Sequence, residues 1–241
     1  MLAQPDTPSA EIPAPLPAER LYLILAAIFI AALVTCNLIF QKFFVWSPFG
    51  LYTFEISVGI LPYPITFLVT DIVSELYGSK RANAIVSAGF VASIFVMGVV
   101  TLATTVTPTA WSPVDAPTFS KVFGLYGPAV FASMSAYLAA QYIDIRIFHF
   151  WKELTHGRHL WLRNNGSTIV SQFVDTLSVL LLLCLAGVIE WQRFGALLAN
   201  GFLFKVIVAL LDTPFFYLAV HWLKPRVVVA EAQAPAATGR A

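Results

Sequence analysis

Ionisable and amide side chains interrupt the apolar stretches of this chain at helical spacing. Asp71 and Glu75 are four residues apart, so a helix through them would carry both carboxyl groups on one face. Gln141 and Asp144 are three apart and would also share a face. An ionisable group held in the middle of a bilayer costs at least about 2.5–3.5 kcal/mol, so it needs a partner or a purpose. The chemistry that such groups can supply is solute binding or coupling to an ion.

Two later stretches repeat this pattern. A polar stripe at helical period contains Asp175 and three serines, Ser167, Ser171 and Ser178, with Gln172 and Thr176 alongside it. Further on, Lys205 and Asp212 are seven residues apart. Asn37 adds an uncharged polar group to the first apolar stretch. We expect all of these faces to turn away from lipid toward a common interior, where they could line a polar cavity.

Two of the carboxyl groups also have a purely structural interpretation. Glu75 could pair with the basic residues Lys80 and Arg81 at the membrane surface, because long side chains readily reach the headgroup region. Asp144 could do the same with Arg146.

Asp71 and Asp175 lie deeper in their apolar stretches, and for them we favour a binding or coupling role. Lys205 could neutralise one of these carboxylates across the bundle.

The elements that must position these groups are apolar stretches long enough for transmembrane helices of about 20 residues. They cover Leu21–Phe40, Ile56–Tyr77, Ala82–Val106, Val122–Ile143, Ser167–Ile189 and Ala196–Leu223. Pro62 and Pro64 predict a kink or a late helix start in the second stretch. The sequence therefore predicts an all-α membrane protein, a six-helix bundle with a kinked second span.

The composition agrees with a protein embedded in lipid. Hydrophobic residues make up 59% of the 241 positions and charged residues 11%, whereas soluble domains carry roughly 25% charged residues. The net charge of +1 gives no reason to propose a nucleic-acid partner. The two cysteines and four histidines lack metal-ligand spacing, and the chain has no Gly-rich ATP-binding loop, so we expect no metal and no cofactor.

The segments between and beyond the spans are predicted as follows. Phe43–Trp46 and Leu51–Phe54 could pair as a short interfacial β-hairpin. Thr107–Lys121, with three prolines, is typical of an irregular external loop. Residues rich in Ala and Pro at both ends predict disordered cytoplasmic tails, which divides the chain into residues 1–20, a transmembrane domain of residues 21–224, and residues 225–241.

The distribution of Lys and Arg predicts the orientation. On the side that holds both termini lie ten basic residues: Arg20, Lys80, Arg81, Arg146, Lys152, Arg158, Arg163, Lys224, Arg226 and Arg240. The opposite side has three, which are Lys42, Lys121 and Arg193. We therefore expect a multi-pass protein of the bacterial plasma (inner) membrane with both termini in the cytoplasm.

The run Tyr63–Gly78, with the sequence YPITFLVTDIVSELYG, closely resembles the signature of the queuosine precursor transporter family, also described as vitamin-uptake-transporter-like. Tyr137–Asp144 is similar to the aromatic, Gln and Asp positions of that family. Arg163–Thr176 resembles its fifth-span motif, and Lys205 matches a lysine in its last span. The likeness covers residues 37–224, which leaves out the tails.

This resemblance implies an importer of 7-deazaguanine bases, namely 7-cyano-7-deazaguanine and its aminomethyl relative, which serve queuosine synthesis in tRNA. A flat base of this kind could stack on Phe67, Phe173 or Trp161. Its guanine-like edge carries two adjacent donors, which suit a carboxylate, and a carbonyl, which suits an amide.

Asp175 with Gln172, and Asp71 with Asn37, would supply that complement. The stretch 158–165 departs from the family pattern by an additional aromatic residue. The candidate residues for substrate binding or coupling are Asn37, Asp71, Glu75, Gln141, Asp144, Arg163, Asn165, Gln172, Asp175 and Lys205.

Several alternatives stay open at this point. The chain could be a facilitator, a proton-coupled carrier, or the substrate-binding membrane subunit of an uptake complex whose ATPase is another chain. A rival from another class is an intramembrane enzyme that uses Asp71 and Asp175 as an aspartyl pair, which would require the two carboxyl groups to share a proton. The expected partners are the lipid bilayer and a small deazapurine base, and the oligomeric state, a homo-oligomer included, is left open.

Overall fold

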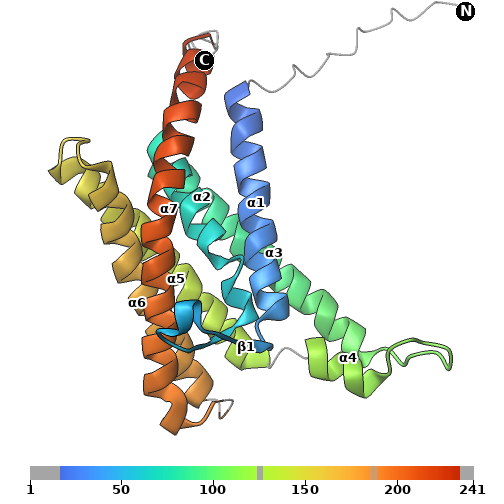
Figure 1. The fold of residues 1–241 in the computed structure, drawn as a ribbon. Coiled ribbons are helices and arrows are strands. Elements are labelled where there is room, and N and C mark those ends of the chain that lie inside the picture. Colours follow the sequence, from blue (N-terminus) through green and yellow to red (C-terminus); the bar gives the residue numbers. More distant parts are fainter. Residues whose placement is uncertain (1–16, 124–126, 186, 188, 234–241) are drawn as a thin grey trace, which may run out of the picture.

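The computed structural model of this chain describes residues 17–123, 127–185, 187 and 189–233. Long helices dominate it, and they cross one another at different angles (Figure 1). They are α1 (Pro17–Ile39), α2 (Tyr63–Tyr77), α3 (Ser79–Thr105), α5 (Gly127–Leu154), α6 (Leu160–Leu185) and α7 (Trp191–Gln233), and the short helix α4 covers Ala116–Phe123. The prediction of an all-α membrane bundle is confirmed.

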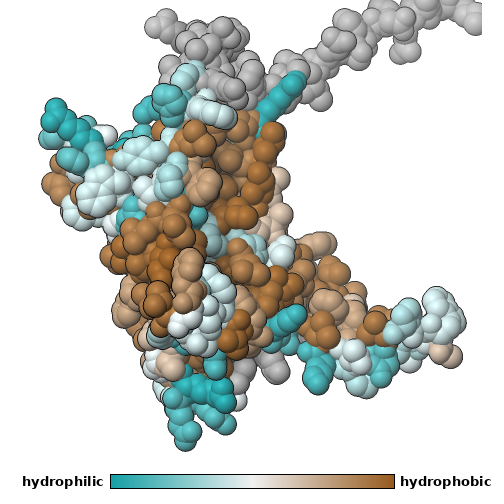
Figure 2. Space-filling model, in the orientation of Figure 1, coloured by the Kyte–Doolittle hydropathy of each residue, from teal (hydrophilic) through white to brown (hydrophobic). Residues whose placement is uncertain are grey.

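Within the described residues, five segments are long and apolar enough to cross a membrane: Ala18–Ile39, Val58–Tyr77, Ser79–Thr105, Leu160–Leu185 and Trp191–Pro225. Helix α5, which covers most of the fourth predicted stretch, is not among these five, and its second half carries Asp144, Arg146 and Lys152. Apolar residues cover the flanks of the helices, while hydrophilic residues gather at the ends of the molecule (Figure 2). Such an exposed apolar band is expected of a surface that faces lipid.

The second apolar stretch is interrupted before its helix begins. A 3-10 turn, η2 (Val58–Ile60), precedes α2, and the Ser57 hydroxyl accepts a hydrogen bond from the Gly59 amide there. Pro62 and Pro64 fall at the N-terminal end of α2, where the missing backbone donors cost nothing. The late helix start leaves α2 only 15 residues long, about 22 Å at 1.5 Å per residue.

Strands β1 (Phe43–Trp46) and β2 (Phe54–Ser57) form the antiparallel hairpin, with Phe43 opposite Ser57 and Trp46 opposite Phe54. The first strand is where the sequence predicts it. The second starts at Phe54 and not at Leu51, because a 3-10 turn, η1 (Pro48–Gly50), lengthens the loop. In this register Phe54 and Ile56 are buried against Phe204 of α7.

The expected loop at 107–121 contains helix α4, so that part of the prediction is wrong. The Asp115 carboxylate accepts a hydrogen bond from the Thr118 amide at 2.9 Å, which satisfies a free donor at the start of the helix. Hydrogen bonding from Thr118 also holds the pKa of the Asp115 carboxyl below its usual range. Pro117 lies in the first turn of this helix, where proline is tolerated, and so does not interrupt it.

Helix extends into both expected tails. Helix α1 begins at Pro17 and α7 continues to Gln233, and Ala18 packs against Val227. The beginning of α1 and the end of α7 therefore lie on the same side of the bundle (Figure 1). The rest of the two expected tails, residues 1–16 and 234–241, lies outside the described residues.

Helix α2 occupies the middle of the bundle. Half of the most apolar part of its membrane-spanning segment is buried inside the protein, compared with 17–33% in the other four apolar segments. It packs against α1, α3, α5 and α7 around a core that includes Phe29, Val73, Phe148 and Phe216. Polar groups on α2 are therefore shielded from lipid by its neighbours.

Candidate functional site

The buried face of α2 carries most of its polar side chains. Four of them are at most 1% exposed: Thr66, Thr70, Asp71 and Ser74. Tyr63 precedes them on the helix and Glu75 follows. These side chains divide the polar interior into a cavity next to Tyr63, a carboxyl pair at Asp71, and an ion cluster at Glu75.

The cavity has a volume of about 230 Å³ and lies at the hairpin end of the bundle. Its wall is mostly apolar, with a few polar groups that converge from different elements, as is usual for sites that bind small molecules. The polar groups come from α1, β2, α2, α5, α6 and α7, and they include Asn37, Glu55, Tyr63, Tyr137, Asp175 and Lys205.

Asp175 is the best-connected polar group of the cavity. Lys205 Nζ lies 2.7 Å from Asp175 Oδ2, and the Tyr63 hydroxyl donates to the same oxygen. Lys205 Nζ also sits 4.1 Å from the centre of the Tyr63 ring. Asp175 Oδ1 is buried and receives no hydrogen bond from the described residues. The ion pair compensates the carboxylate, and one of its two oxygens is left without a donor from the described residues.

A chain of hydrogen bonds leads from the cavity into the bundle. Gln141 on α5 is fully buried, and its amide nitrogen donates to the Tyr137 hydroxyl in the cavity wall. The Thr70 hydroxyl, one residue before Asp71, lies 3.4 Å from the Gln141 amide oxygen. Gln141 therefore connects the cavity wall with the deeper polar groups.

Asp71 on α2 and Asp144 on α5 form the carboxyl pair. They are 1% and 0% exposed, and their carboxyl groups lie next to each other. The Ser171 hydroxyl of α6 donates to Asp144 Oδ1 at 2.8 Å, and Thr168, one turn earlier, lies beside Asp71. The predicted ion pair of Asp144 with Arg146 does not form, because Arg146 points to the exposed side of α5.

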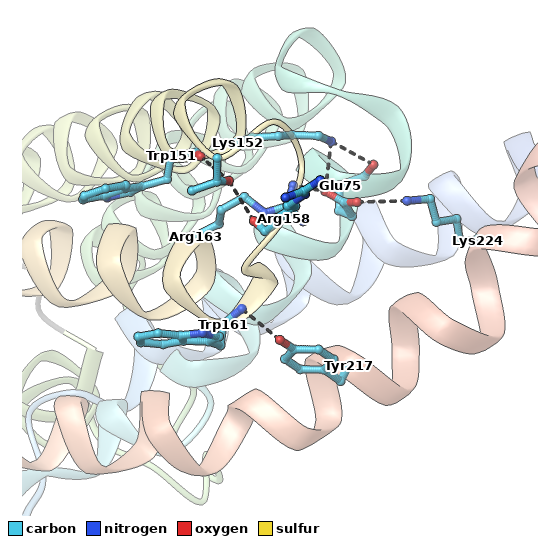
Figure 3. A network of polar contacts seen from close by, with 9 residues as sticks. Glu75, Trp151, Lys152, Arg158, Trp161, Arg163, Tyr217 and Lys224 are labelled. Atoms are coloured by element: carbon cyan, nitrogen blue, oxygen red, sulfur yellow. Dashed lines mark hydrogen bonds and ion pairs between the residues drawn. The ribbon is translucent and has the colours of Figure 1, made fainter.

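The ion cluster joins four helices around one carboxylate (Figure 3). Glu75 Oε2 lies 3.0 Å from Arg163 Nη1 and 2.9 Å from Lys152 Nζ, and Glu75 Oε1 lies 3.1 Å from Lys224 Nζ. The Glu75 side chain is 4% exposed, and the Arg163 guanidinium lies over the Phe148 ring.

Glu75 does not pair with Lys80 or Arg81, the partners that the sequence suggested. Arg81 instead forms a bidentate ion pair with Glu19 of α1, with N–O distances of 2.6 and 3.0 Å. Gly78, with a φ of +82°, ends α2 and starts α3 in a new direction, which carries Arg81 toward α1.

Two predicted site residues stand apart from these groups. The Asn165 amide bonds to Thr213 of α7 at 2.9 Å, which fastens α6 to α7. Gln172 is buried but does not line the cavity. The predicted stacking residues Phe173 and Trp161 are 43% and 53% exposed. Trp161 lies beside Tyr217 (Figure 3) and does not line the cavity.

The structure thus places the predicted residues in different groups. Asn37, Asp175 and Lys205 line the cavity. Gln141, Asp71 and Asp144 lie deeper, and Glu75 and Arg163 form the ion cluster, so Asp71 and Asn37 do not share one wall as the sequence suggests.

The residues of the cavity wall that sequence reasoning missed include Glu55, Tyr63 and Tyr137. Two of them had a detectable signal. Tyr63 is eight residues before Asp71, and Tyr137 is four before Gln141, so both follow the helical period of polar residues that were singled out. Glu55 depends on strand register and had no such signal.

Comparison with known proteins finds matches that cover the segments carrying these polar groups. The family model described as "Putative vitamin uptake transporter" matches residues 57–219, well over half of the chain. A curated relative, the "Probable queuosine precursor transporter" of Bacillus subtilis (strain 168), is 26% identical over 170 residues, which cover 70% of this chain and 73% of that protein. No solved structure gives a significant match. The match contains Tyr63, the carboxyl pair and Glu75, and the chain belongs to the putative vitamin uptake transporter family.

Proposed function

We propose that this chain imports 7-deazaguanine precursors of queuosine, 7-cyano-7-deazaguanine or its aminomethyl relative, across the bacterial plasma membrane. The name of the Bacillus subtilis relative supports the substrate class. The observation that carries the binding role is the cavity beside Asp175, where a buried carboxylate oxygen receives no hydrogen bond from the described residues.

The Asp175–Lys205 pair complements a guanine-like edge. Such an edge presents two adjacent N–H donors next to a carbonyl oxygen. Asp175 can accept from the donors, and Lys205, which lies 2.7 Å away, can donate to the carbonyl. A carboxylate and an ammonium held side by side therefore match the whole edge, which replaces the pairing of Asp175 with Gln172 expected from sequence.

The rest of the cavity suits a flat and small solute. Aromatic rings in the wall offer stacking faces, and they include Phe40, Tyr63, Phe90 and Tyr137. The volume of about 230 Å³ is below the roughly 300–1,000 Å³ that is typical for drug-sized ligands, as suits a single base. The Asn37 amide lines the same space and adds a polar contact.

The proposed orientation has six spans, with α5 as the fourth, and both termini in the cytoplasm. The paired ends of α1 and α7 support an arrangement with both termini on one side. The cavity would then lie toward the outside, and the Glu75 cluster would close the cytoplasmic end. Import requires that the cavity become accessible from each side in turn, which in transporters occurs by movement of helices around a fixed site.

Neither alternative from the sequence gains support from these contacts. An aspartyl enzyme that uses Asp71 and Asp175 would need both carboxyl groups together, whereas Asp175 pairs with Lys205 and Asp71 with Asp144. A subunit that depends on a separate ATPase differs in a testable way, because the chain alone would not carry solute.

The test is uptake of labelled 7-cyano-7-deazaguanine into liposomes that contain only the purified chain. We expect uptake by the wild type, loss of at least tenfold in Asp175→Asn, and little change in Asp212→Asn. Asp212 is a matched control because it is a half-buried carboxyl group on α7 that does not line the cavity. No uptake by the wild type, or equal uptake by Asp175→Asn, contradicts the proposal.

A further inference from the structure

We propose that Asp71 and Asp144 together form a proton-binding site, separate from the solute cavity, through which a proton moves with the transported solute. This inference rests on the proposed transport function. It starts from the contact between two carboxyl groups that the bundle buries completely, one on α2 and one on α5.

Two neighbouring carboxyl groups can form a hydrogen bond only when one of them holds a proton, because an ionised carboxylate can only accept. The surrounding hydroxyl groups leave one oxygen of each carboxyl group without a donor. No donor of the described residues reaches Asp71 Oδ1 or Asp144 Oδ2, although both atoms are buried. Two adjacent carboxylates without a proton would repel each other in the buried interior. The geometry therefore calls for one shared proton.

No Lys, Arg or His of the described residues forms an ion pair with either carboxyl group. The basic group that acts on Asp71 is Arg163, and its guanidinium is bound to Glu75. The other ionisable groups on helices around α2 make their contacts elsewhere: Glu19 with Arg81, Asp175 with Lys205 and Tyr63, Lys152 and Lys224 with Glu75, Tyr137 with Gln141, and His149 among the charges near Glu75. Asp212 on α7 is half-buried away from this pair and has no ion-pair partner among the described residues.

Polar groups connect the pair in both directions. Toward the cavity, Thr70 and Gln141 lead to the Tyr137 hydroxyl. Toward the opposite end, the next charged group is Arg163, whose Nε atom is buried and has no acceptor among the described residues. A proton that arrives from the cavity side and leaves at the Glu75 end would thus travel with an imported solute.

The same layout couples the proton to the ion cluster. When the pair loses its proton, a second negative charge appears beside the first, and it attracts Arg163 away from Glu75. The Glu75 cluster joins α2, α5, α6 and α7, so weakening it would loosen the end of the bundle that is closed here. Protonation of the pair would restore the contacts seen in the structure.

The first experiment measures transport in liposomes with an acidic exterior, one pH unit across the membrane, and the electrical potential clamped at zero. With one proton per uncharged solute, the wild type should accumulate labelled 7-cyano-7-deazaguanine up to about tenfold, since a tenfold ratio balances one pH unit. Asp144→Asn and Asp71→Asn should reach a ratio of one but still exchange labelled for unlabelled base. Asp212→Asn should accumulate like the wild type.

The second experiment detects the proton without transport. Infrared difference spectra of the purified chain at neutral pH should show the carbonyl band of a buried protonated carboxyl group, which Asp144→Asn removes and Asp212→Asn keeps. If Asp144→Asn does not fold, disappearance of the wild-type band at high pH takes its place.

The outcomes separate this inference from the proposed function. Uptake that ignores the pH gradient, or accumulation by both Asn variants equal to that of the wild type, overturns the proton site and leaves the importer standing. Absence of the infrared band also overturns it. A wild type that carries no base refutes the importer, and the infrared band alone then decides whether the carboxyl pair holds a proton.

Discussion

Lys205 and Tyr63 converge on a single oxygen of Asp175. The ammonium nitrogen lies 2.7 Å from Oδ2, and the tyrosine hydroxyl donates to the same atom. Three helices, α2, α6 and α7, thereby meet at one buried charge pair on the wall of the cavity. This arrangement compensates the buried carboxylate and fixes its orientation in the cavity wall.

Removing one partner of this pair should cost more than removing both. Lys205→Met leaves a buried carboxylate without its cation, and broken buried pairs typically cost about 3–5 kcal/mol. The double variant Lys205→Met with Asp175→Asn should recover most of that loss, because no buried charge is left. The check is thermal unfolding of the wild type, Lys205→Met, Asp175→Asn and the double variant in the same detergent. A double variant less stable than Lys205→Met would contradict the pairing.

The Glu75 cluster should owe its stability to its buried members. Arg163 has a side chain 3% exposed, so Glu75→Gln leaves a buried guanidinium without its carboxylate, at a cost of about 3–5 kcal/mol. Lys224 is 56% exposed, and its loss in Lys224→Met should cost at most about 1 kcal/mol because solvent screens the pair. Thermal unfolding measures both effects, and equal losses in the two variants would speak against this ranking.

Two glycines of α3 offer a matched test of how closely α1 and α3 pack. A Cβ atom on Gly89 would meet a Phe29 ring carbon at 2.6 Å and Leu33 Cδ2 at 2.9 Å, whereas one on Gly98 would meet nothing within 4 Å. We expect Gly89→Ala to destabilise the protein by about 1–3 kcal/mol through overpacking.

The control variant, Gly98→Ala, should be neutral or stabilise by up to about 1 kcal/mol, because alanine favours the helix. The comparison uses the unfolding temperatures of the two variants in the same detergent. If both variants behave alike, the close contact between α1 and α3 is not formed in the membrane protein.

Local pattern was sufficient for much of the architecture. Apolar stretches of about 20 residues predict helices at the right places, since lipid tolerates no unpaired backbone groups and leaves helices as the available form. The four-residue spacing of Asp71 and Glu75 also placed both on one helix, and the first strand of the hairpin was found at Phe43–Trp46. Two local predictions were wrong. Pro117 suggested a loop, although proline is tolerated in the first turn of helix α4. The second strand was placed at Leu51–Phe54, whereas it covers Phe54–Ser57, because the loop before it is longer than expected.

The sequence by itself determined that this chain is a helical membrane protein, which positions are polar inside it, and that it resembles a family of transporters. Only the tertiary structure decided which polar groups meet. Asp71 is 73 residues from Asp144 and 104 from Asp175, and helical period says nothing about distances between separate helices. Packing around α2 brings Asp144 to Asp71 and leaves Asp175 to Lys205, because each helix face can touch only the neighbour that the bundle places against it.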